Sequence, residues 1–423
     1  MAILTDVELD VDAPVLRVED PREVLGAVAD LVYGQPSKRM TVLGITGTAG
    51  KTSTAYLIEA GLRAAGHITG LLGTVETRLG DLSVSSVRTT PEATDLHALL
   101  AVAVERGVTA VVMEVSSHAL AMGRVGGVAF DVAGWTNFGT DHLDFHADSA
   151  DYFAAKARLF DGRSLVEVIN FDDPSLRTMI NPGTVTFSGA GDTGATWYAT
   201  GISEDGFGQL FEAHGPMGSV PARVSLPGRH NVANALLAQA MLTSIGIRPE
   251  VAAAGVAVCP GVPGRLERVS AGDSDIIGVV DYAHKTDAIV AALAALRELA
   301  VARNGRLISV IGAGGDRDKG KRPHMGAAAA DGSDLVIVTD DNPRTEDPAA
   351  IRAAVRSGTA SFDREVIEVA GRREAIAEAA RRARPGDVIA VLGKGHETGQ
   401  EVGGEILPFD DRVELATALK EHA

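Results

Sequence analysis

The sequence predicts an α/β protein with mostly parallel sheets, and three observations support this fold class. Apolar strand-like runs alternate with helix-like stretches from residue 41 to about residue 261, a rhythm that is typical of a mostly parallel sheet with helices on both faces. The rhythm restarts after residues 259–265, a Pro-Gly segment that we interpret as a hinge between domains. The chain of 423 residues is also too long for a single core.

The expected elements follow the apolar runs in chain order. One helix-like stretch, residues 21–33, lies in a short N-terminal segment. The central part has expected strands at 41–45 and 108–115 and expected helices at 55–65, 150–159 and 233–245. The last part has expected strands at 277–280, 307–311, 335–339 and 388–392, with helices between them, which indicates a second, Rossmann-like domain. We therefore expect domains at residues 1–38, 39–264 and 265–423.

Bulk composition limits the classes of function. A net charge of −17 disfavours nucleic acid as a main partner, because binding to a phosphate backbone favours a basic face. The single cysteine, Cys259, is typical of a reducing compartment rather than a disulfide framework. No leader-like segment opens the chain, and no apolar run is long enough to cross a membrane. We expect a cytoplasmic monomer that acts on small molecules.

A glycine-rich loop follows the first central strand. Its residues are Gly47, Thr48, Ala49, Gly50, Lys51, Thr52, Ser53 and Thr54. Backbone N–H groups of such a loop can surround phosphate oxygens, and the following helix adds its positive N-terminus. Lys51 can reach the β- and γ-phosphates, and the Thr52 hydroxyl can bind Mg²⁺. In the usual P-loop pattern the first glycine would fall at position 45, which is Ile45 in this chain. The first glycine of this loop is Gly47 instead. We therefore predict a P-loop-type ATPase domain, with an ordinary strand-turn-helix corner as the alternative.

Further polar residues follow the central strands. Glu114 ends the strand at 108–115, where open α/β sheets present ligand groups, so it is a candidate Mg²⁺ ligand or a turn residue. His142 lies in the polar loop 137–144. Lys156 lies on a largely apolar helix, where burial would lower the lysine pKa and favour the neutral amine, although most helical lysines are simply solvated.

Three polar loops in the last domain also follow strands. They contain Arg317, the motif Asp341-Asn342-Pro343-Arg344, and Gly393 with Glu397. Each loop alone could be a solvated turn, but the shared topological position points to one cleft. Arginine forks bind carboxylates and a glutamate binds an ammonium group, so the expected ligand is a zwitterionic amino acid.

Taken together, these motifs resemble the Mur ligases, the ATP-dependent amide-forming enzymes of peptidoglycan synthesis. The resemblance runs from about residue 20 to the end of the chain. It rests on the segments at 47–54, 89–91, 114–118, 141–144, 156, 281–284, 315–323, 341–344 and 393–397. The chain differs from the family at Ala49, where asparagine is common, and at Lys285-Thr286, where Thr-Pro is usual.

The resemblance implies roles for individual residues. It implies ATP contacts from the loop at 47–53 and from Asn231, Arg265 and Asp281, and catalytic roles for Lys51, His142 and Lys156. It implies Mg²⁺ binding by Thr52, Glu114, His142 and a CO₂-derived carbamate on Lys156. The UDP-sugar dipeptide would be held by Thr89, Thr90, Ser116 and Arg124. Within the family, Asp341-Asn342-Pro343-Arg344 implies meso-diaminopimelate rather than L-lysine, bound with Arg317, Gly393 and Glu397.

The implied reaction joins diaminopimelate to the D-glutamyl carboxylate of UDP-N-acetylmuramoyl-L-alanyl-D-glutamate through an acyl phosphate. The family has an N-terminal uridine-binding domain, and we expect residues 1–38 to be its remnant. Three alternatives remain: a folylpolyglutamate-synthetase-like ligase, an inactive nucleotide-binding fragment, and a P-loop motor or switch. The last is disfavoured because Glu114 stands where such proteins have an aspartate.

Overall fold

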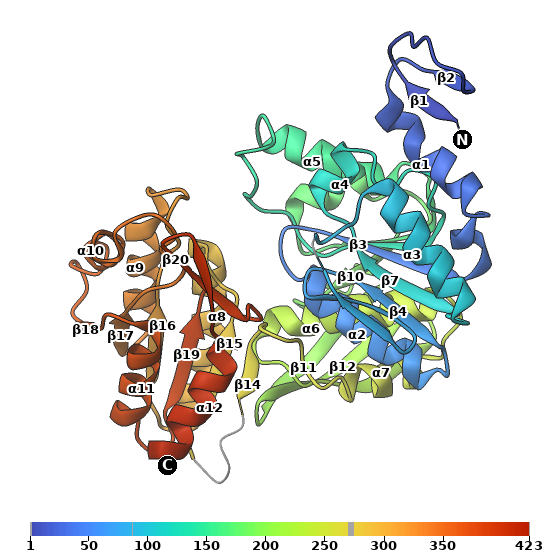
Figure 1. Ribbon diagram of the computed structural model, residues 1–423. Helices are drawn as coiled ribbons and strands as arrows, with labels where there is room; N and C mark the ends of the chain where they lie inside the picture. Colours follow the sequence, from blue (N-terminus) through green and yellow to red (C-terminus); the bar gives the residue numbers. More distant parts are fainter. Residues whose placement is uncertain (1, 87, 270–274, 423) are drawn as a thin grey trace. The chain divides into compact units, whose positions relative to one another are not determined.

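The computed structural model describes residues 2–86, 88–269 and 275–422 and shows an α/β chain with two compact units (Figure 1). The first unit comprises Met1–Ser203, Leu210–Ser225 and His230–Cys259, and the second comprises Glu204–Gln209, Leu226–Arg229 and Pro260–Ala423. The main division, between Cys259 and Pro260, falls inside the Pro-Gly segment. The domain bounds expected from the sequence, residues 1–38, 39–264 and 265–423, stay predictions.

An eleven-stranded sheet forms the centre of the first unit, in the order β13-β12-β11-β10-β9-β8-β3-β7-β4-β5-β6. The middle of this sheet, from β10 to β4, is parallel. Its strands are β3 (Thr41–Thr46), β4 (Thr69–Leu72), β5 (Glu76–Leu79), β6 (Leu82–Ser85), β7 (Ala110–Glu114), β8 (Phe130–Trp135), β9 (Ser164–Asn170), β10 (Val185–Ser188), β11 (Trp197–Asp205), β12 (Gly208–Gly215) and β13 (Gly218–Val224).

Helices and short 3₁₀ turns connect these strands. The helices are α1 (Pro21–Val32), α2 (Lys51–Ala64), α3 (Ala93–Glu105), α4 (Ser117–Ala121), α5 (Ser149–Ala157), α6 (Arg229–Ser244) and α7 (Pro249–Ala257), and the 3₁₀ turns are η1 (Pro36–Arg39), η2 (Arg158–Phe160) and η3 (Pro174–Met179). Helix α2 begins four residues before the expected start, because Gly50 caps it directly after the glycine-rich loop.

The N-terminal segment forms a small parallel pair, β1 (Ile3–Thr5) and β2 (Val15–Arg17), followed by α1. Helix α1 packs against α3. Glycines allow α1 to approach the turn after α4 closely, since a Cβ at Gly26 would lie 2.4 Å from the carbonyl oxygen of Gly126. This approach attaches the segment to the first unit.

Two parts of the first unit depart from the expected strand-helix alternation. Strands β4, β5 and β6 are joined as antiparallel neighbours, and β11, β12 and β13 follow one another along the chain at the other edge of the sheet. Apart from the buried β4, these strands are polar or partly exposed and lack the continuous apolar runs of buried parallel strands. The apolar rhythm predicted a mostly parallel sheet and the strands at 41–45 and 108–115, which correspond to β3 and β7, but it did not predict these antiparallel and edge strands.

The second unit contains a six-stranded sheet in the order β14-β15-β19-β16-β17-β18, parallel except for β14. Its strands are β14 (Glu267–Val269), β15 (Ile277–Asp281), β16 (Leu307–Ile311), β17 (Leu335–Val338), β18 (Glu365–Glu368) and β19 (Val388–Leu392). A separate antiparallel hairpin consists of β20 (Gly399–Val402) and β21 (Glu405–Pro408). The helices are α8 (Thr286–Ala302), α9 (Lys321–Gly332), α10 (Pro348–Ser357), α11 (Arg372–Arg382) and α12 (Asp411–His422).

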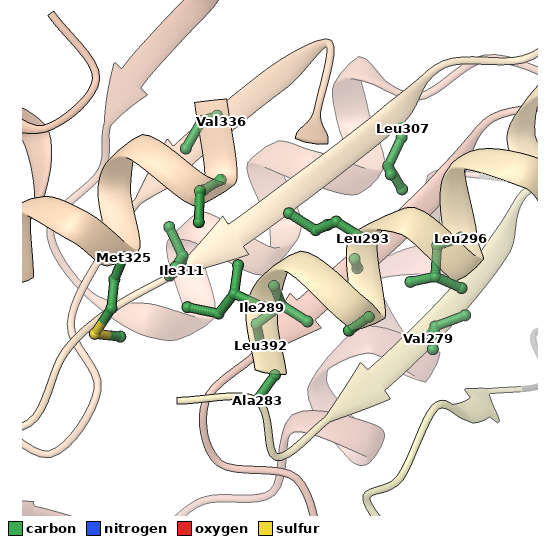
Figure 2. Close-up of a cluster of buried hydrophobic side chains, with 14 of the residues drawn as sticks. Val279, Ala283, Ile289, Leu293, Leu296, Leu307, Ile311, Met325, Val336 and Leu392 are labelled. Atoms are coloured by element: carbon green, nitrogen blue, oxygen red, sulfur yellow. The ribbon is translucent and has the colours of Figure 1, made fainter. Parts of the chain in front are cut away.

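Alternating side chains of the central strands pack into two cores, one on each face of this sheet. Along β19, Val388, Ala390 and Leu392 join the core with α8, α9 and α10, whereas Ile389 and Val391 join the core with α11 and α12. Figure 2 shows the first of these cores, where Leu293 of α8 lies among strand and helix side chains. Burial on both faces explains why these strands read as continuous apolar runs.

No helix of the described residues is long and apolar enough to cross a membrane. The loops at 47–50 and 115–116 in the first unit, and at 312–320, 339–347 and 393–398 in the second, all follow the carboxyl ends of parallel strands. Ligand groups of open α/β sheets gather at these ends.

We predict that Leu293→Ala lowers the free energy of unfolding by about 2–4 kcal/mol, because it removes a fully buried side chain and leaves a cavity. Val290→Ala on the same helix is the matched control, since Val290 is half exposed, and its effect should stay within about 0.5 kcal/mol. Urea unfolding followed by far-UV circular dichroism measures both, and equal shifts would contradict this account of the core.

Candidate active site

The glycine-rich loop joins β3 to α2 in a conformation that only glycine adopts easily. Gly47 has φ 145° and Gly50 has φ 84°, both in the region that disfavours side chains. Space is also short, because a Cβ at Gly47 would lie 1.9 Å from Thr136 Oγ1 and one at Gly50 would lie 2.5 Å from Asn234 Oδ1. The loop thus leads tightly into the N-terminus of a 14-residue helix, whose free N–H groups favour an anion.

Two residues after β8 support the loop from one side. Asn137 accepts a hydrogen bond from the Ala49 N–H at 2.9 Å and donates one to the Ala49 carbonyl oxygen at 3.1 Å. The Thr136 hydroxyl donates to the same carbonyl oxygen at 2.6 Å. The sequence motifs do not point to Thr136 or to this role of Asn137, because neither residue carries charge. A polar pair directly after a parallel strand was the available signal.

Two lysines meet at one carbonyl oxygen of the loop. Lys51 Nζ donates to the Gly47 carbonyl oxygen at 2.7 Å and to that of Thr48 at 3.1 Å. Lys156 Nζ, from α5, donates to the same Gly47 oxygen at 2.8 Å. The structure therefore brings together the two lysines that were predicted from separate motifs.

Lys156 is almost completely buried, with 1% of its surface exposed. Burial lowers the pKa of its amine well below the usual value, and the nearby charge of Lys51 lowers it further, while Asp141 opposes the shift. The Lys156 Nζ also lies 4.6 Å from the centre of the Tyr152 ring. This environment shifts the balance of Lys156 from the ammonium toward the neutral amine.

Glu114 forms the acidic part of the site at the end of β7. Its Oε2 accepts hydrogen bonds from the hydroxyls of Thr52, at 3.0 Å, and Thr74, at 3.1 Å, and its Oε1 accepts from the Thr74 N–H at 2.8 Å. Thr52 lies in the first turn of α2, so the predicted carboxylate and hydroxyl are direct neighbours. Thr74, which no motif indicated, holds both carboxylate oxygens in place.

The residues expected to hold the UDP substrate lie around this carboxylate. The Thr89 hydroxyl is 3.0 Å from that of Thr74, and the Thr90 hydroxyl donates to the Glu114 carbonyl oxygen at 2.9 Å. Ser116 caps α4. Arg124 donates to the Thr90 carbonyl oxygen at 3.4 Å and pairs with Glu92 at 2.9 Å.

His142 belongs to an aromatic cluster beside the loop. It has φ 54°, and its ring centre lies 4.7 Å from that of His118 and 6.1 Å from that of Tyr152. Tyr152 connects this cluster to the loop, because its hydroxyl is 3.2 Å from the Thr48 hydroxyl. Among the residues that the structure describes, no three His, Cys, Asp or Glu side chains converge as metal ligands.

Asn231 of α6 is connected to the loop through Asn234. Its Oδ1 accepts from Asn234 Nδ2 at 3.0 Å, and Asn234 is the residue that crowds Gly50. The other two expected ATP contacts, Arg265 and Asp281, lie in the second unit. The Arg265 guanidinium lies 4.5 Å from the centre of the Tyr282 ring, and burial raises the pKa of Asp281.

In the second unit, a buried lysine joins two of the predicted loops. Lys394 Nζ donates to Asn342 Oδ1 at 2.9 Å and to Glu397 Oε2 at 3.1 Å, and Asn342 Nδ2 donates to the same Glu397 oxygen at 3.0 Å. The Lys394 side chain is fully buried. Lys394 lies within the motif at 393–397, but its role became visible only from its contacts.

Arg344 and Arg317 lie on the neighbouring part of the same unit. Arg344 Nη1 donates to the Gly315 carbonyl oxygen at 2.7 Å, and a Cβ at Gly314 would lie 3.0 Å from Arg344 Nη1 and 3.9 Å from Arg317 Cγ. Asp341 faces the buried Arg372 at 3.8 Å, and a Cβ at Gly393 would lie 2.4 Å from Asp341 Oδ2. The three predicted loops thus gather at one edge of the second sheet.

Comparison with known proteins identifies the family. Residues 45–242 match the Mur ligase middle domain, and residues 264–395 match the Mur ligase, glutamate ligase domain. This chain belongs to the Mur ligase family. The predicted family and α/β fold are confirmed.

Relatives of known name extend this comparison. The chain is 50% identical over 417 residues to the UDP-N-acetylmuramoyl-L-alanyl-D-glutamate–2,6-diaminopimelate ligase of Streptomyces avermitilis, covering 96% of this chain and 81% of that one. A solved structure of a ligase with the same name has a TM-score of 0.72 and 32% identity, covering 99% of this chain and 86% of the other. A folylpolyglutamate synthase from Mycobacterium tuberculosis, solved with ADP, has a TM-score of 0.68 at 21% identity and covers 88% of this chain and 92% of its own, which shows a shared fold alone.

We predict that Gly50→Ala lowers the affinity for ATP at least about tenfold, because the added methyl group would displace the Asn234 side chain and strain the loop. Gly66→Ala is the matched control. Gly66 follows the same helix, has φ 88° and has open space around it, so its substitution should reduce stability by about 1–2 kcal/mol without changing ATP affinity. Calorimetric titration with ATP measures both, and equal affinities would exclude close packing at Gly50 as a requirement.

Proposed function

We propose that this chain is the ATP-dependent ligase that joins meso-diaminopimelate to UDP-N-acetylmuramoyl-L-alanyl-D-glutamate in peptidoglycan synthesis. The observation that carries the proposal is the convergence on one glycine-rich loop of Lys51, the buried Lys156 and the Thr52–Glu114 pair. The names of the relatives agree with this activity. We further propose the residue roles stated below and a monomeric state.

The residues of the first unit suit ATP and magnesium. The adjacent oxygens of Thr52 and Glu114 are the hard ligands that Mg²⁺ prefers. The neutral amine of Lys156 is the form that reacts with CO₂, so a carbamate there would add carboxylate-like oxygens beside the loop. A bound Mg²⁺ would supply positive charge that offsets the phosphate oxygens, and His142 is the remaining proposed ligand.

The other residues of this unit bind and orient the reactants. Backbone N–H groups at 47–53 and the Lys51 ammonium hold the triphosphate, while Thr89, Thr90, Ser116 and Arg124 hold the UDP-sugar dipeptide. The γ-phosphoryl group would pass from ATP to the D-glutamyl carboxylate, which breaks its bond to the β-phosphate oxygen and gives an acyl phosphate and ADP. The amine of diaminopimelate then attacks the acyl carbon, and the tetrahedral intermediate collapses to the amide and inorganic phosphate. Positioning of both reactants supplies much of the acceleration.

The second unit offers groups for a zwitterionic amine. Arg317 and Arg344 provide guanidinium donors for carboxylates. Asp341 and Glu397 provide carboxylates for ammonium groups, and Asn342 and the backbone at Gly393 complete the proposed set. Diaminopimelate has a second carboxylate that L-lysine lacks, and Arg344 is the proposed partner for it. A folylpolyglutamate-synthetase-like activity would not need Asp341-Asn342-Pro343-Arg344, so this motif favours the diaminopimelate ligase.

We predict that Lys156→Ala lowers the rate of amine-dependent phosphate release roughly 10²–10³-fold, because it removes one electrostatic contribution to the site. Formate or acetate should restore part of the rate. Carbon-13 NMR of the wild type with labelled bicarbonate should show a carbamate signal that is absent in Lys156→Ala and present in the control Lys420→Ala, whose lysine is exposed on α12. A wild-type rate in Lys156→Ala would remove the carbamate from the mechanism.

We predict that Arg344→Ala lowers kcat/KM for meso-diaminopimelate roughly 10- to 100-fold, because it removes charge-assisted hydrogen bonds to the second carboxylate. The value for L-lysine should change little. Arg373→Ala is the control, since Arg373 is exposed and pairs with Glu414. Phosphate release with each amine, in the presence of ATP and the UDP-dipeptide, measures these values.

Binding of ATP by the wild type without any amine-dependent phosphate release would instead support the inactive-fragment alternative.

A further inference from the structure

The hairpin β20–β21 lies outside the six-stranded sheet of its unit. An isolated two-stranded hairpin is at best marginally stable in water, and β21 is exposed along its whole length. Contacts made by the hairpin to the rest of the unit must therefore hold it in place. Several of its hydrogen bonds go to the loop that follows β17.

Four hydrogen bonds connect the hairpin to residues 341–344. Gln400 Nε2 donates to the Asp341 carbonyl oxygen at 2.6 Å, and the Glu401 N–H donates to Asn342 Oδ1 at 3.0 Å. The backbone of Arg344 pairs with the hairpin in both directions, donating to the Glu401 carbonyl oxygen at 3.0 Å and accepting from the Gly403 N–H at 2.7 Å. The hairpin thus fixes the backbone of the proposed carboxylate-binding arginine.

Glu401 also contacts the charged end of that arginine. Its Oε2 lies 3.0 Å from Arg344 Nε, while Arg344 Nη1 donates to the Gly315 carbonyl oxygen. These two acceptors contact different nitrogens of the planar guanidinium, which has five N–H donors in fixed directions. The donors of Nη2 and the second donor of Nη1 are not used by these contacts.

The backbone conformation of Arg344 shows that this placement is imposed by its surroundings. Arg344 has φ 54°, which is uncommon for a residue with a side chain and indicates surroundings that hold it there. The backbone pairing with the hairpin supplies that support, and the Glu401 carboxylate then sets the rotation of the side chain. A second carboxylate on the same hairpin, Glu405, lies on the exposed strand.

We propose that Glu401 is a positioning residue that determines specificity for amino acids with a second carboxylate. By holding the Nε side of Arg344, it directs the remaining N–H donors toward the ligand and reduces the conformational freedom lost on binding. This inference rests on the proposed function, because it deepens the role given there to Arg344. The role concerns recognition only, so the chemical step should be unaffected.

The test compares Glu401→Ala, Glu401→Gln and the control Glu405→Ala. Glu401→Ala should raise KM for meso-diaminopimelate about two- to fivefold, the range of a partly exposed ion pair, with kcat and the KM for ATP unchanged. Glu401→Gln keeps an oxygen that can accept from Nε and should lie between the wild type and Glu401→Ala. The KM for L-lysine should not change in any of them, and Glu405→Ala should match the wild type throughout.

A double-mutant cycle separates positioning from a general effect on the fold. In the Arg344→Ala background, Glu401→Ala should have no further effect on KM, because the side chain that it positions is absent. An unchanged or lower KM in Glu401→Ala would overturn the proposal, and the lower value would show that Glu401 competes with the ligand. An equal rise of KM for L-lysine, or an altered circular dichroism spectrum, would assign the effect to the hairpin as a whole and would also overturn it.

These outcomes are distinct from failure of the proposed function. If the wild type releases no amine-dependent phosphate, the proposed function fails. If the wild type is active and Arg344→Ala loses diaminopimelate selectivity while Glu401→Ala does not, only the inference about Glu401 fails.

Discussion

The meeting of two lysine side chains at the Gly47 carbonyl oxygen is the constraint on which the first site depends. Lys51 approaches from the helix that begins at the loop, and Lys156 approaches from a helix more than 100 residues later in the chain. Burial is the main cause that lowers the pKa of Lys156, and the nearby charge of Lys51 lowers it further. One carbonyl oxygen thus connects the proposed phosphate-binding loop to the lysine that is proposed to react as a neutral amine. Gly47 and Gly50 allow the tight turn of this loop, because both have a positive φ.

In the second unit, buried cations pair with amide and acidic side chains. Lys394 donates hydrogen bonds to Asn342 and Glu397. Arg372 lies 3.8 Å from Asp341 and forms a bidentate pair with Asp411. Asn342 and Glu397 remain partly exposed, whereas Asp341 is buried. Burying charges is costly unless each has partners; here Lys394 is paired with two of the proposed binding residues, and Arg372 is paired with Asp411 and lies near the proposed residue Asp341. The contacts that stabilise these buried cations therefore also hold proposed binding residues in place.

Much of the fold could be predicted from the sequence, because buried parallel strands such as β16 and β19 are apolar runs, interrupted in β16 only by Ser309. The expected bounds 307–311 and 388–392 agree with these strands. Half-exposed strands such as β11 and β13 carry no such run, and they were missed. At the site, charged residues in glycine-rich loops were recognisable, and their convergence followed from parallel topology. Supporting residues such as Thr74 and Thr136 were not, because a single hydroxyl has no pattern along the chain and acquires a partner only in three dimensions.

The hydrogen bonds that Lys394 makes to two loops at once have a consequence for ligand binding. Asn342 and Glu397 belong to loops that follow different strands, β17 and β19, yet one buried nitrogen is bonded to both. A ligand group that moves either side chain changes the hydrogen bond that the same nitrogen makes to the other. Under the proposed roles of Asn342 and Glu397, binding at one of them is therefore energetically coupled to binding at the other.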